Sequence, residues 1–325
     1  MKTPGILVLS ALLFFISCSE KKIHPYAFYY WKTKLSLDVD EKKALERSTT
    51  PYLYTRFFDV DKSAGRFRPV AMLTKDPSFN TGKKIVPVVF ITNRTFFQIQ
   101  HQDIARLAKS VNDLIGKKAL QFRLPVHPEI QIDCDWTEGT REDYFLFLKE
   151  LRKISRKEIT CTLRLHQVKD KARTGIPPVS KVYLMCYSTS SPLENSKKNS
   201  ILDTALLKNY LAGINEYPIR HIKIALPIYS WGIVTNHLGK HRLINAMSRK
   251  DLENTSFKRI SEAEAEVLKD GFYFGHYLNK GFRIKIEEIP DGQLRDVTGF
   301  LERKIKHFDI IYYQLDRKFV TGREL

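Results

Sequence analysis

The chain has 325 residues, of which 43% are hydrophobic and 12% aromatic, and its 54 Lys and Arg against 36 Asp and Glu give a net charge of +18. This composition excludes a disordered chain and a fibrous repeat, and the length fits two ordinary domains or one large α/β barrel with insertions. In a cytosolic protein the positive charge would favour a nucleic-acid partner, so its meaning depends on the compartment.

A targeting segment is the first feature along the chain. Lys2 carries a positive charge, and residues 6–16 are apolar but too short to cross a bilayer comfortably. Because small residues follow at once, this pattern predicts a signal peptide. No later stretch approaches 18 consecutive apolar residues, so the sequence predicts no membrane-spanning helix.

The end of the apolar run, Phe-Ile-Ser-Cys over 15–18, resembles a bacterial lipobox, in which the signal is cut before a cysteine that becomes acylated. The resemblance implies a signal peptide over 1–17, lipidated Cys18 as the mature N-terminus, and a tether over 18–26. Each buried acyl methylene contributes about 0.8 kcal/mol to membrane binding. Ser19, the residue directly after this cysteine, resembles the residue that sorts such proteins to the outer membrane. An ordinary signal peptide with an incidental cysteine is the alternative.

Eight apolar runs bounded by turn or helix signals predict eight β-strands that alternate with amphipathic helices. This order predicts an α/β fold, a (β/α)₈ TIM barrel, as one domain over 27–325. The strands are expected at 27–33, 53–60, 84–92, 129–136, 160–166, 181–187, 221–229 and 308–315. The helices are expected at 102–115, 141–154, 203–215 and 292–307.

A long segment separates the seventh and eighth predicted strands. It predicts an α+β insertion at about 232–290, with a helix over 261–268 and a hairpin whose turn is 279–281. An insertion after the seventh strand lies at the C-terminal mouth of a barrel, where barrels carry their active sites.

No metal or cofactor is predicted. Cys134, Cys161 and Cys186 lie in apolar strand-like runs without metal-type spacing, which predicts buried free thiols. His237 and His241 have the i, i+4 spacing of a metal pair, but they lie in the insertion and no adjacent aspartate motif accompanies them.

Charged side chains are predicted inside the barrel. Strand alternation places Asp133 and Asp135 on the lumen face of the fourth strand, Arg164 and His166 on that of the fifth, and Lys223 on that of the seventh. Buried charges of both signs are tolerated when they pair, so structural ion pairs are one interpretation. Polar residues at the C-terminal end of a strand favour a functional site instead.

Three short motifs follow the predicted strands in order. They are Ile-Asp-Cys-Asp-Trp over 132–136, Met-Cys-Tyr-Ser over 185–188 and Leu-Pro-Ile-Tyr over 226–229. Together they resemble glycoside hydrolases of family eighteen, the chitinase-like barrels, which carry Asp-x-x-Asp-x-Asp-x-Glu, Met-x-Tyr-Asp and Leu-Pro-x-Tyr-Gly on the same strands. Asp133 and Asp135 match the second and third aspartates. The resemblance covers the mature chain and implies a glycan or polysaccharide partner.

The chain departs from this pattern at the family's acid. That glutamate lies two residues after the last aspartate, and here the place holds Thr137, which has no proton to donate at a useful pKa. Glu138 lies one residue on and points away from the lumen by alternation, unless the strand ends at Trp136 and the chain turns. Ile130 replaces the first aspartate, and Ser188 replaces the aspartate of Met-x-Tyr-Asp.

Two functions fit these residues. A divergent glycan hydrolase needs two carboxyl groups roughly 5–9.5 Å apart. The expected catalytic residues are Asp133, Asp135 and Glu138, with Asp59 or Asp316 as acids from other strand ends.

The alternative is a non-catalytic barrel that binds a glycan or a protein. Aromatic rings near strand ends offer flat apolar faces to sugar rings, although they more often serve packing. The expected substrate-binding residues are Trp136, Arg164, His166, Tyr187, Tyr229 and Trp231.

The predicted compartment changes the meaning of the charge. Removal of 1–17 takes away only one positive charge, so the mature chain remains strongly basic. In the bacterial cell envelope, with a lipid anchor in the outer membrane, the expected anionic partners are lipid headgroups, lipopolysaccharide or acidic glycan, and not nucleic acid. A diffusely basic surface is the alternative. We expect a monomer.

Overall fold

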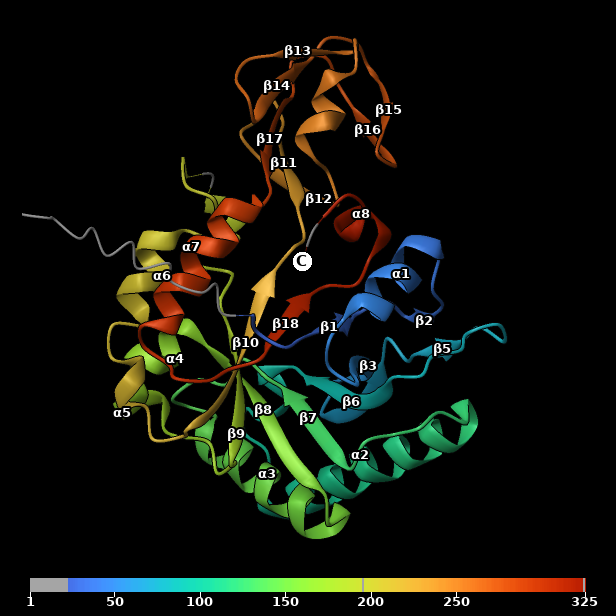
Figure 1. Ribbon diagram of the computed structural model, residues 1–325, viewed down its shortest axis with the longest axis vertical. Coiled ribbons are helices and arrows are strands. Elements are labelled where there is room, and N and C mark those ends of the chain that lie inside the picture. Colours follow the sequence, from blue (N-terminus) through green and yellow to red (C-terminus); the bar gives the residue numbers. More distant parts are fainter. Residues whose placement is uncertain (1–22, 195, 324) are drawn as a thin grey trace, which may run out of the picture.

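The computed structural model describes residues 23–194, 196–323 and 325. Within them, eight parallel strands close into a barrel, because the first strand pairs with both the second and the last (Figure 1). The predicted TIM barrel is confirmed. Its strands are β1 Tyr26–Tyr30, β3 Tyr52–Ser63, β6 Lys84–Ile91, β7 Glu129–Asp133, β8 Glu158–Arg164, β9 Lys181–Met185, β10 His221–Pro227 and β18 Ile310–Tyr313. The predicted signal peptide and Cys18 lie outside the described residues.

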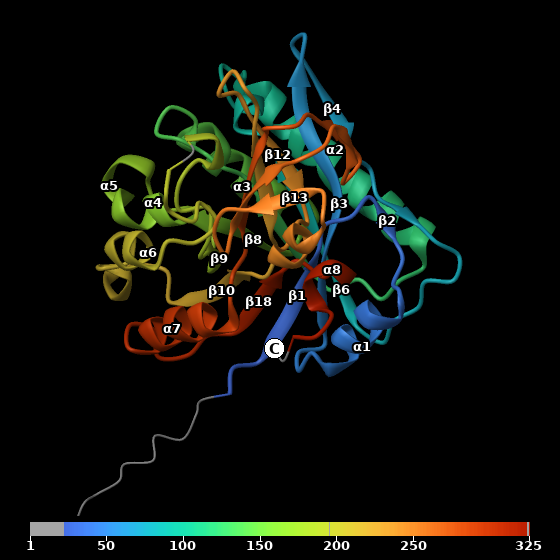
Figure 2. The same cartoon turned by 90° about the horizontal axis from the view of Figure 1, so that it is seen from above.

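Helices surround the barrel, and α4 to α7 lie on a different side from α1 and α2 (Figure 2). They are α1 Val39–Arg47, α2 His101–Phe122, α3 Arg141–Ser155, α4 Leu165–Lys169, α5 Lys171–Thr174, α6 Thr204–Tyr210, α7 Asp291–Glu302 and α8 Arg317–Val320. Short 3₁₀ helices are η1 Asn93–Thr95, η2 Pro192–Glu194, η3 Ile214–Glu216 and η4 Arg249–Glu253. None of the helices in this part of the chain is long and apolar enough to span a membrane.

Local sequence explains the main helices. The apolar stripe of α3 is buried against the barrel at Tyr144, Phe147, Leu148 and Leu151. Helix α1 was missing from the sequence prediction, although Asp38 and Glu41 form a capping box at its start. Between β3 and β6 no helix is formed among the described residues. A hairpin with β4 Arg66–Val70 and the short pair β2 Lys34–Leu35 and β5 Thr74–Lys75 take its place.

The insertion between β10 and β18 is confirmed, and it rises above the barrel in Figure 1. It contains a five-stranded antiparallel sheet, in the order β12-β11-β17-β14-β13, over an apolar core of its own. The strands β15 and β16 form a separate pair. The strands of the insertion are β11 Trp231–Thr235, β12 His241–Asn245, β13 Phe257–Arg259, β14 Glu264–Val267, β15 Gly271–Tyr273, β16 His276–Leu278 and β17 Arg283–Glu287.

Two predictions within the insertion are wrong. The helix expected over 261–268 is strand β14, whose Ala265 and Val267 are buried on one face. A turn forms at 279–281 as expected, since the Phe282 N–H donates to the Asn279 carbonyl oxygen at 3.1 Å, but the hairpin around it does not form. The hairpin turn lies at Phe274 and Gly275, which both have positive φ, 54° and 77°. Accordingly β16 pairs with β15, while β17 pairs with β11 and β14.

The three cysteines of the barrel are buried free thiols, as predicted. Cys134, Cys161 and Cys186 are fully buried and form no disulfide. Burial raises the pKa of the Cys161 thiol to about 12, so it stays protonated and unreactive at neutral pH.

Candidate functional site

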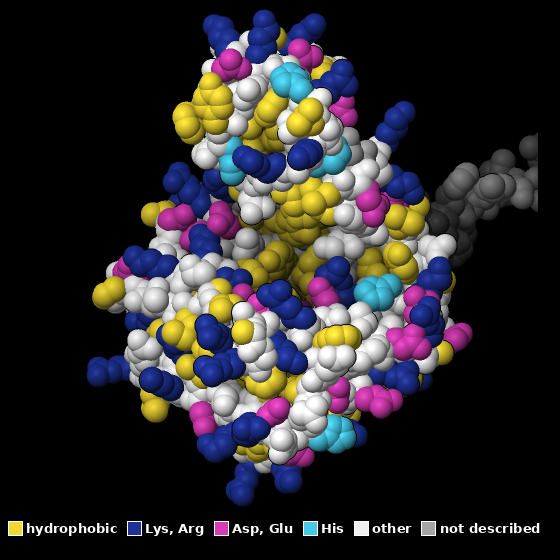
Figure 3. Space-filling view, turned by 180° about the vertical axis from the view of Figure 1, so that it is seen from behind, with side chains coloured by type: hydrophobic (Ala, Val, Ile, Leu, Met, Phe, Trp, Pro, Cys, Tyr) yellow, Lys and Arg dark blue, Asp and Glu magenta, His cyan; other side chains and the backbone are white. Residues whose placement is uncertain are grey.

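A cleft of about 540 Å³ opens at the C-terminal ends of the barrel strands. Its walls come from the ends of most barrel strands, and Asn245 and Ala246 of the insertion close one side. Figure 3 shows a hollow between the insertion and the barrel body in which hydrophobic side chains gather. This is the end of the barrel at which loops of a TIM barrel hold active sites.

Aromatic rings form a continuous band in this cleft. The Tyr313 ring, at the end of β18, stacks on Tyr187 with centroids 5.4 Å apart. It also contacts Tyr229 and Trp31, each with centroids 5.5 Å away. Trp231 extends the band, since its ring lies 5.2 Å from that of Tyr229. Tyr187 and Tyr229 are buried, while Trp31, Trp231 and Tyr313 keep part of their surface exposed to the cleft.

Two of the predicted aspartates lie in the cleft. Asp133 ends β7 with its side chain in the lumen, and the Thr162 hydroxyl donates to its Oδ1 at 2.7 Å. Burial, together with the nearby Asp135 charge, raises the pKa of Asp133 to about 7. Asp135 is half exposed and pairs with Arg164 at 3.2 Å. The cleft therefore holds two neighbouring aspartates, one paired with Arg164 and one buried with a raised pKa.

A third carboxyl group, Asp59, reaches the cleft because β3 carries a bulge between Arg56 and Phe58. Strict alternation from Arg56 would place Asp59 on the helix-facing side, and the extra residue, Phe57, turns it into the lumen. Arg56 Nη1 lies 3.6 Å from Asp59 Oδ2. The other oxygen, Oδ1, is buried and has no hydrogen-bond partner among the residues described. Burial raises the pKa of Asp59.

The structure places three predicted site residues outside the cleft. Trp136 is fully buried under α3, where it stacks on Tyr144. Glu138 is exposed and pairs with Arg173 of α5 at 2.9 Å. His166 is exposed on α4. The reason is that β7 ends at Asp133 and β8 at Arg164, so strand alternation no longer orients the residues that follow; Asp135 still lines the cleft, whereas these three side chains do not.

The loop after β7 is held by its own polar network. The Thr137 backbone N–H donates to the Thr140 hydroxyl at 3.0 Å, and Asn93 Nδ2 donates to the Thr137 hydroxyl at 3.5 Å. Thr137, which stands where the family has its acid, is thus used to fix the loop.

Sequence reasoning missed several residues that line the cleft, notably Trp31, Arg56 and Tyr313. Trp31 and Tyr313 lie at the C-terminal ends of strands that were predicted, so strand-end position was the available signal for them, whereas Arg56 lies within β3. Asp59 and Asp316, which were expected only as alternative acids, both line the cleft. In the described ranges no group of three or more His, Cys, Asp or Glu side chains is placed to hold a metal.

No protein-family model matches this chain, and no curated protein matches it. Solved structures do. The spore cortex-lytic enzymes SleL of Bacillus cereus and Bacillus megaterium QM B1551 share 14% and 13% identity, with TM-scores of 0.54 and 0.55. Each similarity covers 90% of this chain, and 71% and 70% of those chains.

The C-terminal domain of a protein assigned as a chitinase, from Desulfitobacterium hafniense DCB-2, gives a TM-score of 0.58 at 11% identity, over 93% of this chain and 97% of that domain. At such identities the similarity concerns the fold alone. The predicted resemblance to chitinase-like barrels is confirmed at that level.

Proposed function

We propose that the barrel binds a glycan chain in the mouth cleft. The observation that carries this is the band of partly exposed aromatic rings beside the carboxyl groups of Asp59, Asp133 and Asp135. Flat rings pack on the apolar faces of sugars, while carboxylates and Arg164 offer hydrogen bonds to hydroxyl groups. The solved structures with this fold are named as spore cortex-lytic enzymes and as a chitinase, which supports a glycan ligand by fold analogy.

The cell envelope is the proposed setting. The lipobox-like run over 15–18 supports acylation of Cys18, and Ser19 supports the outer membrane. Mass spectrometry of the mature N-terminus tests this, because an unmodified Cys18 would overturn it.

The proposal predicts that Trp31→Ala and Trp231→Ala each weaken glycan binding about tenfold to hundredfold, which corresponds to about 1.4–2.8 kcal/mol of lost ring contact. Calorimetric titration with soluble β-1,4-linked N-acetylated oligosaccharides and with acidic polysaccharides measures the affinity.

Phe272→Ala is the matched control, because Phe272 is 79% exposed on β15 and lies outside the cleft. Equal affinities for the wild type, both tryptophan variants and the control would contradict a glycan site in the cleft. Thermal unfolding of each variant separates lost contact from lost folding.

Glycan hydrolysis is a second candidate, favoured by the position of Asp59. Its burial and raised pKa favour the protonated form that a general acid needs. In this reaction Asp59 would donate a proton to the glycosidic oxygen as the bond to the anomeric carbon breaks. Water would then add to that carbon and give its proton back to Asp59, while Asp135 would stabilise the positive charge that develops there.

Hydrolysis predicts that Asp59→Asn lowers turnover about hundredfold, the usual contribution of a general acid. Glu138→Gln is the matched control, since Glu138 pairs with Arg173 outside the cleft, and it should turn over at the wild-type rate. Reducing-end release from the same glycans is the measurement. A wild type that binds these glycans without releasing products would leave only the binding function.

A further inference from the structure

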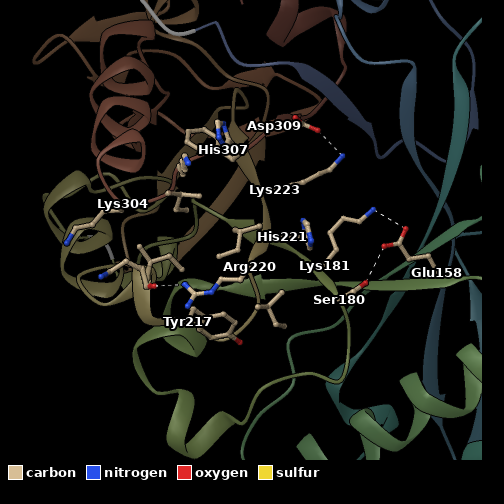
Figure 4. Close-up of a pocket in the computed structure, with 17 residues that line it drawn as sticks. Glu158, Ser180, Lys181, Tyr217, Arg220, His221, Lys223, Lys304, His307 and Asp309 are labelled. Carbon is tan, nitrogen blue, oxygen red and sulfur yellow. Dashed lines mark hydrogen bonds and ion pairs between the residues drawn. The ribbon is translucent and has the colours of Figure 1, made fainter. Parts of the chain in front are cut away.

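A second and larger cavity, of about 950 Å³, opens at the opposite end of the barrel (Figure 4). It lies at the N-terminal ends of β9 and β10 and beneath the loop that leads from α7 into β18. Cationic side chains dominate its lining. The charged residues are Glu158, Lys181, Arg220, Lys223, Lys304, Lys306 and Asp309.

Its carboxylates are already neutralised by the two innermost lysines. Figure 4 shows Lys223 pointing toward Asp309, and their charged groups lie 3.0 Å apart. Lys181 contacts Glu158 at 3.2 Å and the buried Glu129 at 2.8 Å. These pairs close the inner wall of the cavity and leave its outer cations without acidic partners.

Three cations therefore remain at the rim. In the part of the chain that the structure describes, Arg220, Lys304 and Lys306 form no ion pair, and Arg220 and Lys304 contact only backbone carbonyl oxygens, each at 3.1 Å. His221 and His307 are exposed beside them. A concave surface with three unpaired positive charges attracts anions.

The start of the described chain packs against this same rim. The His24 ring stacks on Phe308, which lines the cavity, with centroids 4.1 Å apart. Its Nε2 contacts Glu302 at 2.8 Å. The Ile310 backbone N–H donates to the Pro25 carbonyl oxygen at 2.8 Å. Residues 24–25 are thus fixed at the base of the barrel, at the end of β1 that is opposite to the mouth cleft.

This position limits where a lipid on Cys18 can lie. Five residue steps separate Cys18 from Ile23, and a fully extended chain spans at most about 18 Å over that length. An acyl anchor on Cys18 would therefore hold the base of the barrel near the membrane surface. The mouth cleft, at the other end of β1, would face away from it.

We propose that the base cavity binds the phosphate groups of anionic lipid headgroups, so that the barrel stands with its base on the membrane and its mouth cleft free for a glycan. The orientation rests on the proposed acylation of Cys18, whereas the binding rests on the charges of the cavity. A Lys or Arg close to an anionic membrane strengthens binding about fivefold, so the three rim cations together contribute about hundredfold.

The test uses the predicted mature chain, residues 18–325, with Cys18→Ser, so that neither an acyl chain nor the apolar signal segment contributes, and vesicles of phosphatidylglycerol mixed with phosphatidylcholine. We expect cosedimentation with these vesicles and none with phosphatidylcholine alone. The triple variant Arg220→Gln, Lys304→Gln and Lys306→Gln should bind about hundredfold more weakly, and Lys306→Gln alone about fivefold. Circular dichroism verifies that each variant is folded.

The matched control removes three exposed cations from the insertion, with Arg242→Gln, Lys250→Gln and Lys258→Gln, and should keep the affinity of Cys18→Ser. An equal loss in this control would show diffuse charge attraction and overturn the proposal. Saturable binding of inorganic phosphate without vesicle binding would also overturn it, because the ligand of the cavity would then be a soluble anion and not a lipid headgroup. Mass spectrometry of wild-type Cys18 tests the anchor separately.

Discussion

Replacing Trp136 with alanine should lower the free energy of unfolding by about 3–5 kcal/mol and leave glycan affinity unchanged. The indole is fully buried, stacks on Tyr144 with centroids 5.1 Å apart, and also contacts Phe145. Its Nε1 donates to the Thr174 carbonyl oxygen at 2.9 Å. The substitution therefore opens a large cavity between the barrel and α3 and leaves a buried acceptor without its donor.

Urea unfolding measures the loss, and the calorimetric titration measures the affinity. Trp136→Phe is the conservative comparison, since it keeps a stacked aromatic ring and removes the hydrogen bond with the smaller part of the indole; loss of the hydrogen bond costs about 1–3 kcal/mol. Trp231→Ala should show the opposite pattern, with the larger effect on affinity. If Trp136→Ala weakened glycan binding at unchanged stability, the placement of this ring outside the cleft would be refuted.

Alternation predicted the orientation of side chains well wherever a strand is regular. It placed Asp133 of β7 and Arg164 of β8 on the lumen face, and both line the cleft. The expected role of Trp136 in binding came instead from its aromatic character. For Glu138 alternation had no bearing, because β7 ends at Asp133 and the loop geometry that follows depends on long-range contacts with Asn93 and Arg173.

The bulge in β3 shows what local sequence could not supply. Arg56, Phe57, Phe58 and Asp59 fit a regular strand equally well, and the extra residue becomes visible only in the pairing with β6. That pairing joins segments about thirty residues apart in the chain. The position of Asp59 in the cleft follows from this register, so its candidacy as an acid could be stated from the sequence but its orientation could not.

Strand β14 shows the same limit for secondary structure. Its sequence is rich in Glu and Ala, which favour a helix intrinsically. The strand forms because it pairs with both β13 and β17, and Ala265 and Val267 enter the core of the insertion. Tertiary pairing outweighs the local preference of four residues, whereas the barrel strands were predictable because their β-branched and aromatic runs agree with their final environment.

The second prediction with a large effect concerns Asp133 and the pH dependence of the free energy of unfolding. Its pKa is about 7 in the folded chain against 3.8 ordinarily, so between these values the folded state holds a proton that the unfolded state has released. The contribution of Asp133 to stability therefore falls as pH rises from about 4 to about 7. Asp133→Asn removes this dependence while its amide oxygen can still accept from Thr162. The variant should therefore gain up to about 4 kcal/mol over the wild type across this range, with no further gain above pH 8.

Urea unfolding of wild type and variant at pH 4, 6 and 8 measures the difference between them, in which the titration of other groups largely cancels. A difference that stays constant from pH 4 to pH 8 would contradict the raised pKa of Asp133. Asp135→Asn is the informative comparison, because removal of the neighbouring like charge lowers the pKa of Asp133 and moves the loss to lower pH. Asp133 destabilises the folded barrel at neutral pH and lies inside the aromatic mouth cleft. The presence of such a carboxyl group is better explained by a role in ligand binding than by a role in folding.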